Sequence, residues 1–542
     1  MRARGPVRAD PPFGVRLRRP PADNVRVDVR ERRTAWREGD TAVREEHETA
    51  LTWSRYNRLF ESGRFGLFLY NALSNTMLRL DEPHYRALEA LRDSDGVAAG
   101  AAHAHMAGDP GLSAQLRDGK VLVAPGEEKA ELLTRRYARE ALHFATSALG
   151  LTVCPTLACN FRCPYCFEHS QTDGTAMSPD TVDRLLAFIA SHTDARRLGV
   201  TWYGGEPTLA WDTIRDITER VLKLDLTYEN AGLVTNGYLL DAGKIAQLAD
   251  LRITSIQVTL DGPRAVHDQR RVLPGGRPTY ERILANLDTL MGTSWEGRCA
   301  IRVNVDKHNL ESFLGLREEL LGRYDDKRLA VYAGHVHTDP GDGYGDGCSM
   351  DGCEWADYTL GLYAEAMLLP TRGFFPSAAP GGCVANAHQG WVVGPAGELY
   401  KCWEDVGRPE MVVGSVHADP VITDPELRAR YSLGTDPYED AACLACDVLP
   451  ICSGGCPNKR LRALQCGEEG LEFCSPYKHH LEAYLEAYYD TFLTREICAA
   501  VLGSGTPEQD DRGWRVVSPA PARPDEGQDP LAGPIPATAD LD

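Results

Sequence analysis

A repeated alternation of strand-like and helix-like segments between residues 151 and 370 is the feature that most constrains this fold. Short apolar runs expected to be strands lie at residues 151–156, 198–203, 232–236, 255–260, 299–305 and 329–335. Amphipathic stretches expected to be helices lie at residues 179–191, 214–224, 242–248, 280–290, 310–320 and 354–369. Strands that alternate with helices predict a parallel α/β sheet, and six such pairs are too few to close an eight-stranded barrel. We therefore expect a partial (β/α)6 TIM barrel with functional residues at the carboxyl ends of its strands.

A small α+β module is expected before the barrel, in residues 51–130. A hairpin at 65–70 and 76–80 is followed by helical patterns near 82–91 and 113–116 and by a closing strand at 119–123. This order predicts a winged-helix-like module. No helix in it is basic enough to make DNA the natural partner.

The other expected segments follow from composition. Residues 1–50 and 503–542 are rich in Arg, Pro and Asp, have little apolar periodicity and are predicted to be disordered. The barrel core is expected at 150–370, and a cysteine-rich domain at 375–500. The formal net charge of −20 argues against nucleic-acid binding through a broad basic surface. No apolar run is long enough to span a bilayer and no secretory signal is recognised, so a soluble cytoplasmic protein without a membrane partner is expected.

The 16 cysteines are unevenly placed along the chain. Three lie at 159–166 and six at 443–474, and long stretches have none. In a long chain without a recognised export signal, this clustering favours thiolate ligation of metals or iron–sulfur clusters over disulfides. Cys154, Cys299 and Cys498 lie in apolar segments and are expected to be ordinary packing residues.

The loop after the first expected strand contains Cys159, Cys163 and Cys166 in a Cys-x3-Cys-x2-Cys pattern. Three thiolates are one short of the four that a cubane cluster takes, so one iron is left for a cofactor or substrate. Structural zinc normally takes four protein ligands, so the loop is a poor structural zinc site.

This loop, with Tyr165 directly before its third cysteine, resembles the signature of radical S-adenosylmethionine (radical SAM) enzymes. Further motifs match the family in order, each near a strand end: Tyr203-Gly204-Gly205-Glu206-Pro207, Thr235-Asn236-Gly237, Thr259-Leu260-Asp261-Gly262-Pro263, His267-Asp268 with Arg271, and Arg302-Val303-Asn304. The resemblance covers roughly residues 150–370.

The resemblance implies a cofactor and a chemistry. Cys159, Cys163 and Cys166 would hold a [4Fe–4S] cluster whose fourth iron is chelated by SAM, and reductive cleavage of SAM would give a 5′-deoxyadenosyl radical that abstracts hydrogen. The other residues implied to contact SAM are Tyr165, Gly204, Gly205, Glu206, Pro207, Thr259, Arg271, Arg302 and Asn304. No local motif identifies a catalytic base, although Glu354 and Asp357 lie in a suitable region.

A second cysteine pattern lies towards the C-terminus. Cys383 and Cys402 have the spacing Cys-x13-Gly-x4-Cys, and a Cys-x2-Cys-x5-Cys-x3-Cys run at 443–456 is followed by Cys474. This order resembles the SPASM extension of radical SAM enzymes that modify peptides and proteins. The resemblance implies two auxiliary [4Fe–4S] clusters, one held by Cys443, Cys446, Cys452 and Cys474, and the other by Cys383, Cys402 and Cys456.

The second of these ligand sets departs from the family pattern, because residues 376–382 contain no additional cysteine. Either Cys348 or Cys353 supplies the fourth thiolate, or one iron stays open to substrate or to another ligand. Cys466 is surplus. A zinc site built on Cys443–Cys456 remains an alternative, since a Cys-x2-Cys pair is also half of a common zinc knuckle.

The main functional prediction is a SPASM-type radical SAM maturase that forms a thioether or carbon–carbon cross-link, or oxidises a side chain, in a ribosomally made peptide or protein. One alternative is an anaerobic sulfatase-maturating enzyme, which forms formylglycine. Another is a non-catalytic iron–sulfur or zinc-binding electron carrier. Expected partners are a precursor peptide or protein and a flavodoxin- or ferredoxin-type reductant. Residues 51–130 either bind a leader peptide or are a structural extension.

Overall fold

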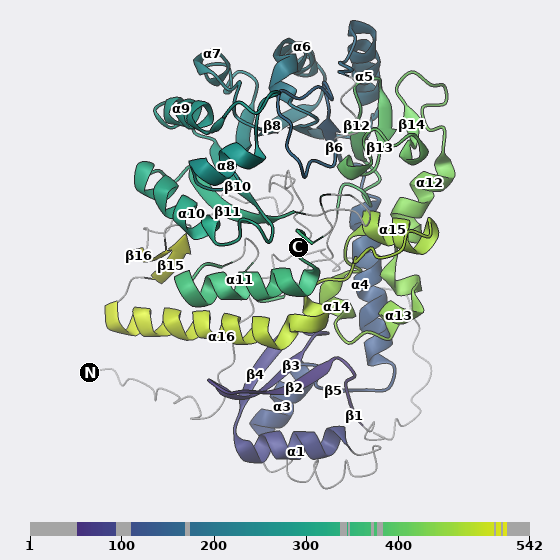
Figure 1. Cartoon of the computed structure of the whole chain (residues 1–542). Coiled ribbons are helices and arrows are strands. Elements are labelled where there is room, and N and C mark those ends of the chain that lie inside the picture. Colours follow the sequence, from purple (N-terminus) through teal and green to yellow (C-terminus); the bar gives the residue numbers. More distant parts are fainter. Residues whose placement is uncertain are drawn as a thin grey trace, which may run out of the picture.

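Six parallel strands, neighbouring in their order along the chain, form the centre of the fold (Figure 1). The structure is a computed structural model, and it describes residues 51–93, 110–168, 174–336, 344, 347–369, 373–376, 383–502, 506–510 and 513–517. The six strands are β6 (Ala148–Val153), β7 (Arg197–Trp202), β8 (Thr227–Thr235), β9 (Ile253–Thr259), β10 (Arg298–Val305) and β11 (Leu329–His335).

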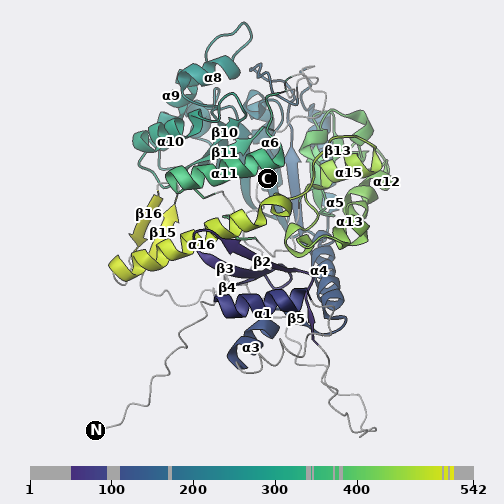
Figure 2. The same ribbon diagram turned by 60° about the horizontal axis from the view of Figure 1, so that its bottom comes forward.

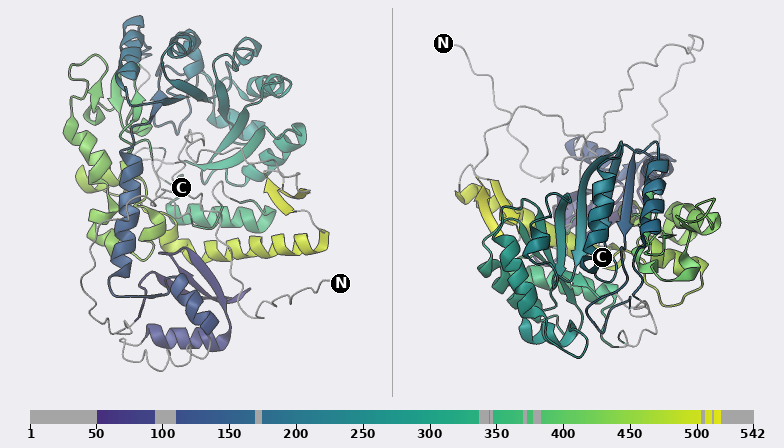
Figure 3. Two further views of the ribbon diagram at one scale, coloured as in Figure 1. Left: turned by 180° about the vertical axis from the view of Figure 1, so that it is seen from behind. Right: turned by 90° about the horizontal axis from the view of Figure 1, so that it is seen from above.

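Helices connect these strands. They are α5 (Pro179–Ser191), α6 (Trp211–Val221), α7 (Ala242–Ile245), α8 (Arg264–Arg270), α9 (Tyr280–Met291), α10 (Ser312–Arg323) and, after the last strand, α11 (Gly352–Ala366). Sequential strand order makes every crossover advance in the same direction, which places the helices along one side of the sheet. The view from above in Figure 3 shows the strands with helices packed along them. The predicted parallel α/β fold is confirmed, and its layout is that of a partial barrel.

The C-terminal cysteine-rich segment continues the same sheet, which the sequence did not predict. Strand β12 (Gly390–Val393) pairs in parallel with β6, from Gly390 opposite Gly150 to Val393 opposite Val153. Strands β13 (Glu398–Tyr400) and β14 (Gly414–Ser415) then extend it antiparallel, giving nine strands within the described residues. The loop that contains Cys402 is therefore anchored to the edge of the barrel sheet.

Short helices and one long helix complete this segment. They are α12 (Pro425–Ala429), α13 (Ala441–Leu444), α14 (Leu449–Cys452), α15 (Pro457–Gln465) and α16 (Tyr477–Leu502). Helix α16 runs beside α11, as Figure 1 shows. Helix α4 (Glu127–His143) precedes the barrel and lies along the same segment through ion pairs of Arg136 and Arg139 with Asp436.

The N-terminal module is built around a three-stranded antiparallel sheet in the order β2–β3–β4. Its elements are β1 (Thr52–Trp53), β2 (Asn57–Ser62), β3 (Gly66–Asn71), β4 (Thr76–Leu80), α1 (Glu82–Arg92), α3 (Pro110–Asp118) and β5 (Leu122–Val123). The expected hairpin is β3–β4. The closing strand β5 pairs with β1 rather than with the hairpin, and β2, which the sequence did not predict, forms the third strand.

Both faces of this small sheet are covered. Apolar side chains on one face pack with α1 and α3 around Leu88 and Leu116. The other face, which includes Tyr56 and Phe68, packs against Ile451 of α14 and Leu485 of α16. Figure 2 shows the module below α16. A hydrophobic core thus attaches the module to the cysteine-rich segment. The outer strands of its three-stranded sheet are β2 and β4.

The structure describes different amounts of the two terminal segments predicted to be disordered. Residues 1–50 lie outside the described residues. The stretch predicted to be disordered from residue 503 contains strands β15 (Thr506–Asp510) and β16 (Gly513–Val517), which pair antiparallel. The disorder of the tail stays a prediction, and the β-branched pair Val516-Val517 gives β16 local strand propensity. Among the described helices, none is both long enough and apolar enough to cross a bilayer.

Candidate active site

The three-cysteine loop leaves the carboxyl end of β6 and folds back over the sheet. The amide of Arg162 donates to the carbonyl of Val272 at 2.8 Å, which ties the loop to the end of α8. Burial, Glu206 and Cys163 together raise the pKa of Cys159 to about 12. Burial, then Glu168 and the thiols of Cys163 and Cys159, likewise raise the pKa of Cys166 to about 12. The three thiols therefore lie within electrostatic range of one another.

The two glycines after β7 are required by close backbone contact with this loop. A Cβ added to Gly205 would lie 2.3 Å from the carbonyl oxygen of Leu157, and one added to Gly204 would lie 2.4 Å from that of Thr156. Gly204 also has a φ of +113°, a conformation that other residues rarely adopt. The segment that approaches the cysteine loop thus consists of main chain, which can present amide and carbonyl groups to a ligand.

Glu206 points away from that segment into the protein. Its carboxylate is fully buried and accepts hydrogen bonds from the Thr208 amide at 3.0 Å, the Thr235 hydroxyl at 2.7 Å and the Asn236 amide at 2.7 Å. Burial raises the pKa of Glu206, and these donors oppose the rise. Glu206, which was predicted to contact SAM, therefore links the ends of β7 and β8. Pro207 begins the turn that follows.

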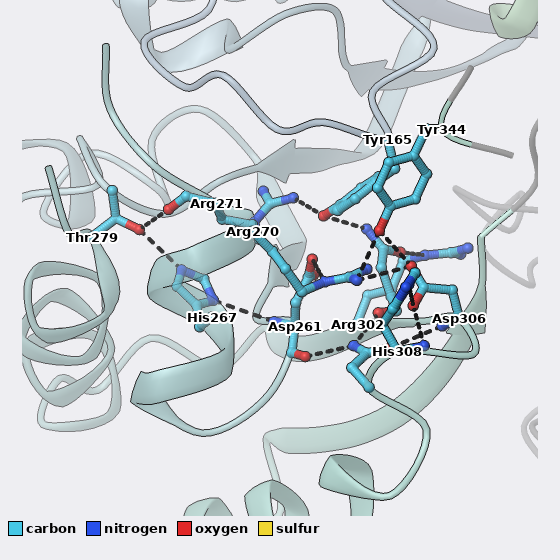
Figure 4. Close-up of polar contacts among 12 residues, drawn as sticks. Tyr165, Asp261, His267, Arg270, Arg271, Thr279, Arg302, Asp306, His308 and Tyr344 are labelled. Carbon is cyan, nitrogen blue, oxygen red and sulfur yellow. Dashed lines mark hydrogen bonds and ion pairs between the residues drawn. The ribbon is translucent and has the colours of Figure 1, made fainter. Parts of the chain in front are cut away.

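Tyr165 joins the cysteine loop to the ends of α8 and β10 (Figure 4). Its hydroxyl accepts hydrogen bonds from Arg271 at 2.6 Å and from Asn304 at 3.2 Å. Arg302 donates to Asn304 at 2.8 Å, and a Cβ added to Gly334 would lie 2.4 Å from Nε of Arg302. Four of the residues predicted to contact SAM, Tyr165, Arg271, Arg302 and Asn304, are therefore joined by hydrogen bonds. Thr259 is buried and lies opposite Arg302 in the sheet.

A buried ion-pair network beside these residues was not predicted from the sequence. Arg270 contacts Asp261 at 3.1 Å and Asp306 at 2.8 Å, and both carboxylates are completely buried (Figure 4). The hydroxyl of Tyr344 donates to Asp306 at 2.8 Å. Asp261 and Asp306 each follow a strand end by one or two residues, so their position was the available signal. This network fixes the loops after β9 and β10.

His267 connects the same loops through hydrogen bonds on both ring nitrogens. Its Nδ1 accepts from the Asp261 amide at 3.2 Å, which leaves the proton on Nε2, 3.0 Å from the Thr279 hydroxyl. That hydroxyl donates to the carbonyl of Arg271. Burial, with Arg271 and Arg270 nearby, holds the pKa of His267 well below its usual range, so the ring is neutral. The neutral imidazole thereby positions Arg271.

Cys383, Cys402 and Cys456, which we call the first auxiliary group, come together although they span more than seventy residues. Burial, Asp405, Glu404, Cys383 and Cys456 all raise the pKa of Cys402. A buried network links the two ends of the group: Asn458 donates to Asp405 at 2.7 Å and to the hydroxyl of Tyr431 at 2.8 Å, and Tyr431 also donates to Asp405.

We call Cys443, Cys446, Cys452 and Cys474 the second auxiliary group. Burial raises the pKa of Cys452, and Cys474 and Cys443 raise it further. A Cβ added to Gly455 would lie 1.7 Å from the Phe473 carbonyl, which brings the segment after Cys452 against the one that carries Cys474. Cys446 and Cys452 also pack against the core that the N-terminal module shares with α14 and α16.

Other predicted candidates lie elsewhere. Cys348 is 3.7 Å from Nε2 of His308 at the barrel mouth, and Cys353 is near Asp351 and Glu472, so each has neighbours other than the first auxiliary group. Cys466 is exposed. Glu354 caps α11 and pairs with Lys307 at 2.7 Å, and Asp357 lies 3.2 Å from His480.

The donor sets fit the cofactors that the sequence implies. Among the described residues, no three His, Cys, Asp or Glu side chains converge as ligands of a single metal ion. Nε of Arg271 and Nδ2 of Asn160 are buried without a hydrogen-bond partner in the described part of the chain. Such donors suit the carboxylate and hydroxyl groups of SAM. The thiol-only groups suit iron–sulfur clusters, which cysteine thiolates hold.

Comparison with known proteins identifies the class. Residues 153–320 match the family described as the radical SAM superfamily. The chain is 22% identical over 378 residues to a serine-type anaerobic sulfatase-maturating enzyme of Bacteroides thetaiotaomicron, covering 62% of this chain and 89% of that protein. It is also 28% identical over 199 residues to a GTP 3′,8-cyclase of Klebsiella pneumoniae, covering 34% of this chain and 54% of that protein. The solved structure of anSMEcpe with bound AdoMet aligns with a TM-score of 0.50 and 17% identity, covering 64% of this chain and 94% of that one, and shows a shared fold.

The partial barrel and the three-cysteine loop at its mouth agree with this match to the radical SAM superfamily. Residues 153–320 are a radical SAM domain, and the chain is an enzyme that uses a [4Fe–4S] cluster and SAM. The alternative of a non-catalytic electron carrier is therefore wrong, because the chain has the domain of a catalytic family.

Proposed function

We propose that the protein is a radical SAM maturase that modifies a peptide or protein, by forming a thioether or carbon–carbon cross-link or by oxidising a side chain. The observation that carries this proposal is that the cysteine-rich segment continues the sheet of the radical SAM domain and brings Cys402 near Cys383 and Cys456, and Cys452 near Cys443 and Cys474. The sulfatase-maturating relative supports it, since that enzyme's name denotes action on a protein.

Cys159, Cys163 and Cys166 would hold the cluster that binds SAM. Together, this cluster and SAM supply a carbon-centred radical that abstracts hydrogen from an unreactive C–H bond. Arg271, oriented by Tyr165 and His267, presents an unpaired Nε–H and a positive charge suited to the SAM carboxylate. The main chain at Gly204–Gly205 lies against the cysteine loop and offers polar groups there.

The remaining SAM-site candidates have supporting roles in this proposal. Glu206, with Pro207 after it, holds the glycine segment in place through the end of β8. Asn304 and Arg302 orient Tyr165 and lie at the barrel mouth, where Thr259 also lies. Glu206 and Thr259 are buried and Arg302 and Asn304 are half-buried, and the hydrogen bonds of Glu206, Arg302 and Asn304 hold the glycine segment and Tyr165 in place.

The two auxiliary groups would each hold a [4Fe–4S] cluster. In the first group, three thiols leave one ligand position for substrate or for another side chain. In the second group, four thiols complete the ligand set. Cys402 closely follows β13, which is joined through β12 to the barrel strand β6, and Cys456 directly precedes helix α15.

The N-terminal module is proposed to bind a leader segment of the substrate. The sulfatase-maturating relative is matched over 89% of its length by 62% of this chain, so this chain has residues beyond those that relative requires. The module's sheet has both faces covered, and an extended peptide can therefore add only at an outer strand, β2 or β4. A module that only supports α14 and α16 would be the contrasting outcome.

Formylglycine formation is the second candidate. It is favoured by the Klebsiella aerogenes relative, also a serine-type anaerobic sulfatase-maturating enzyme, which is 24% identical over 329 residues and covers 55% of this chain and 77% of that protein. A sulfatase-derived serine peptide, incubated with reconstituted enzyme, SAM and dithionite, separates the two. Conversion of its serine to formylglycine would select this candidate.

Iron and sulfide analysis tests the main proposal. After anaerobic reconstitution, wild type is expected to hold about twelve irons, as three four-iron clusters, and the Cys159/Cys163/Cys166→Ala variant about four fewer. The same samples are assayed for 5′-deoxyadenosine, which the variant should not form. A wild-type count near four with bound zinc would contradict the auxiliary clusters and leave only the radical SAM core.

A further inference from the structure

Two cations contact the sulfur atoms of the second auxiliary group. Nη1 of Arg460 donates to Sγ of Cys443 at 3.2 Å. Nζ of Lys478 lies 3.6 Å from Sγ of Cys474. Arg460 belongs to α15, and Lys478 belongs to the first turn of α16. The group therefore has positive charge at two of its four thiols.

Arg460 is held rigidly in this position. Its side chain is only 2% exposed and forms an ion pair with Asp440. Asp440 also caps α13, accepting from the Ala442 amide at 2.7 Å, and the guanidinium lies 5.2 Å from the ring centre of Phe473. Because the helix cap and the ring fix the guanidinium, its charge cannot move away from Cys443 without breaking several contacts.

One N–H of this guanidinium still lacks an acceptor. Nε of Arg460 is buried and has no hydrogen-bond partner within the described residues. A buried donor left unpaired is destabilising. Thiolate and sulfide atoms of a bound cluster would provide such acceptors beside Cys443, so the arginine suits an anionic sulfur-rich ligand.

The first auxiliary group has different surroundings. Burial and then Glu404 raise the pKa of Cys456, and Glu404 with Asp405 also raises that of Cys402. Lys401 and Lys459 act in the opposite direction, on Cys383 and Cys456 respectively. Both carboxylates and ammonium groups therefore lie near the first group, whereas at the second group a guanidinium and an ammonium contact sulfur atoms directly, with Asp440 near Cys443.

We propose that Arg460, with a smaller contribution from Lys478, raises the reduction potential of the cluster held by the second auxiliary group. Reduction adds one electron, and hence one negative charge, to a cluster. Hydrogen bonds to sulfur and nearby net charge set such potentials, and a buried cation stabilises the added charge more than an exposed one. Arg460 is thus expected to favour storage of an electron on this cluster. The inference rests on the proposed function, because the second group must hold a cluster.

The test compares Arg460→Gln with a matched control, Arg462→Gln. Arg462 lies on the same helix, is equally buried and pairs with Glu468. Full-length reconstituted enzyme is titrated with dithionite and followed by electron paramagnetic resonance. In Arg460→Gln, one cluster signal should need a lower potential, with its reduced-to-oxidised ratio at fixed potential falling about tenfold, or about 59 mV for one electron. Arg462→Gln should titrate as wild type.

Two further variants, Arg460→Lys and Lys478→Gln, test the same cluster if Arg460→Gln loses iron. Arg460→Lys retains the charge and should shift the same signal less. Lys478→Gln changes an exposed side chain and should lower the potential of that signal by a smaller amount. Unchanged signals in Arg460→Gln, or in Lys478→Gln if the former loses iron, would overturn the inference. A wild-type count near four irons would instead overturn the proposed function and this inference with it, whereas about twelve irons with unchanged potentials would overturn the inference alone.

Discussion

The barrel mouth and the C-terminal cysteine region hold their thiols by different means. At the barrel mouth, several residues around the three-cysteine loop lie near the carboxyl ends of parallel strands, such as Thr259 on β9 and Asn304 on β10, and sheet register brings them together. In the C-terminal region, the cysteines lie in short turns and helices. Individual side-chain contacts hold these segments together, such as those of Asn458 with Asp405 and of Arg460 with Cys443.

Charge balance also differs between the two regions. The buried acids Asp261 and Asp306 at the barrel mouth share one arginine, Arg270, which pairs with both carboxylates. In the C-terminal region, Arg460 contacts both Asp440 and a cysteine sulfur, and Glu404 lies near thiols. Cations at the barrel mouth thus fix loops through carboxylates, whereas in the C-terminal region a cation also contacts a thiol directly.

The largest contrast should come from the cysteines themselves. Cys159/Cys163/Cys166→Ala should abolish formation of 5′-deoxyadenosine, because it removes the thiols that hold the SAM-binding cluster. Cys443/Cys446→Ala should retain SAM cleavage and lose modification of the peptide. Both are measured by chromatography and mass spectrometry on samples with matched circular dichroism spectra. Wild-type peptide modification in folded Cys443/Cys446→Ala would refute the role of the second auxiliary group.

Arg270→Leu should be the most destabilising single substitution at the barrel mouth. It leaves two completely buried carboxylates without their cation, which typically costs about 3–5 kcal/mol. The measurement is the free energy of unfolding in urea. Arg264→Gln removes an exposed ion pair with Glu281 and should change stability by less than about 1 kcal/mol. Equal effects of the two variants would argue against a buried network that is essential for folding.

Asn458→Ala should have a smaller effect, in the C-terminal region. It removes donors to Asp405 and Tyr431 and leaves buried polar atoms unpaired, at a cost of about 1–3 kcal/mol. Urea unfolding and iron content are measured together, since the network joins the segments that carry Cys402 and Cys456. Gln465→Ala, which removes a hydrogen bond to the Gly434 carbonyl at a more exposed position, is the control. Retention of full stability in Asn458→Ala would mean that this network does not hold the two segments.

The smallest predicted effect is a pH dependence at the barrel mouth. The pKa of His267 is well below its usual range because of burial and the two neighbouring arginines, so the unfolded chain binds a proton that the folded chain does not. Stability from this residue is complete above about pH 6.5 and is lost as pH falls, by up to about 1.4 kcal/mol per pH unit. The loss between pH 7.5 and 5.5 should be smaller in His267→Gln, whose amide can accept and donate as the neutral ring does. An identical pH dependence in both proteins would show that His267 is not held neutral.

Much of the barrel was predictable because its determinants are local. Hydrophobic periodicity and turn residues place each strand within a few residues. The carboxyl ends of parallel strands necessarily meet at one edge of the sheet. The loop cysteines were placed after the first strand in this way, whereas Tyr165, Arg271 and Asn304 were predicted from the resemblance to radical SAM enzymes. The network of Asp261, Arg270 and Asp306 was missed, although two of its members also follow strand ends, because a sequence does not show which buried charges pair.

The C-terminal region shows where sequence information ends. The cysteine spacing determined that this segment is rich in thiolate ligands, and composition and periodicity determined the α/β class of the core. Only the tertiary structure decided that β12 extends the barrel sheet, that the N-terminal module packs on α14 and α16, and that Arg460 contacts Cys443. These contacts join residues tens to hundreds of positions apart, and they depend on shape, burial and charge balance, which no local pattern encodes.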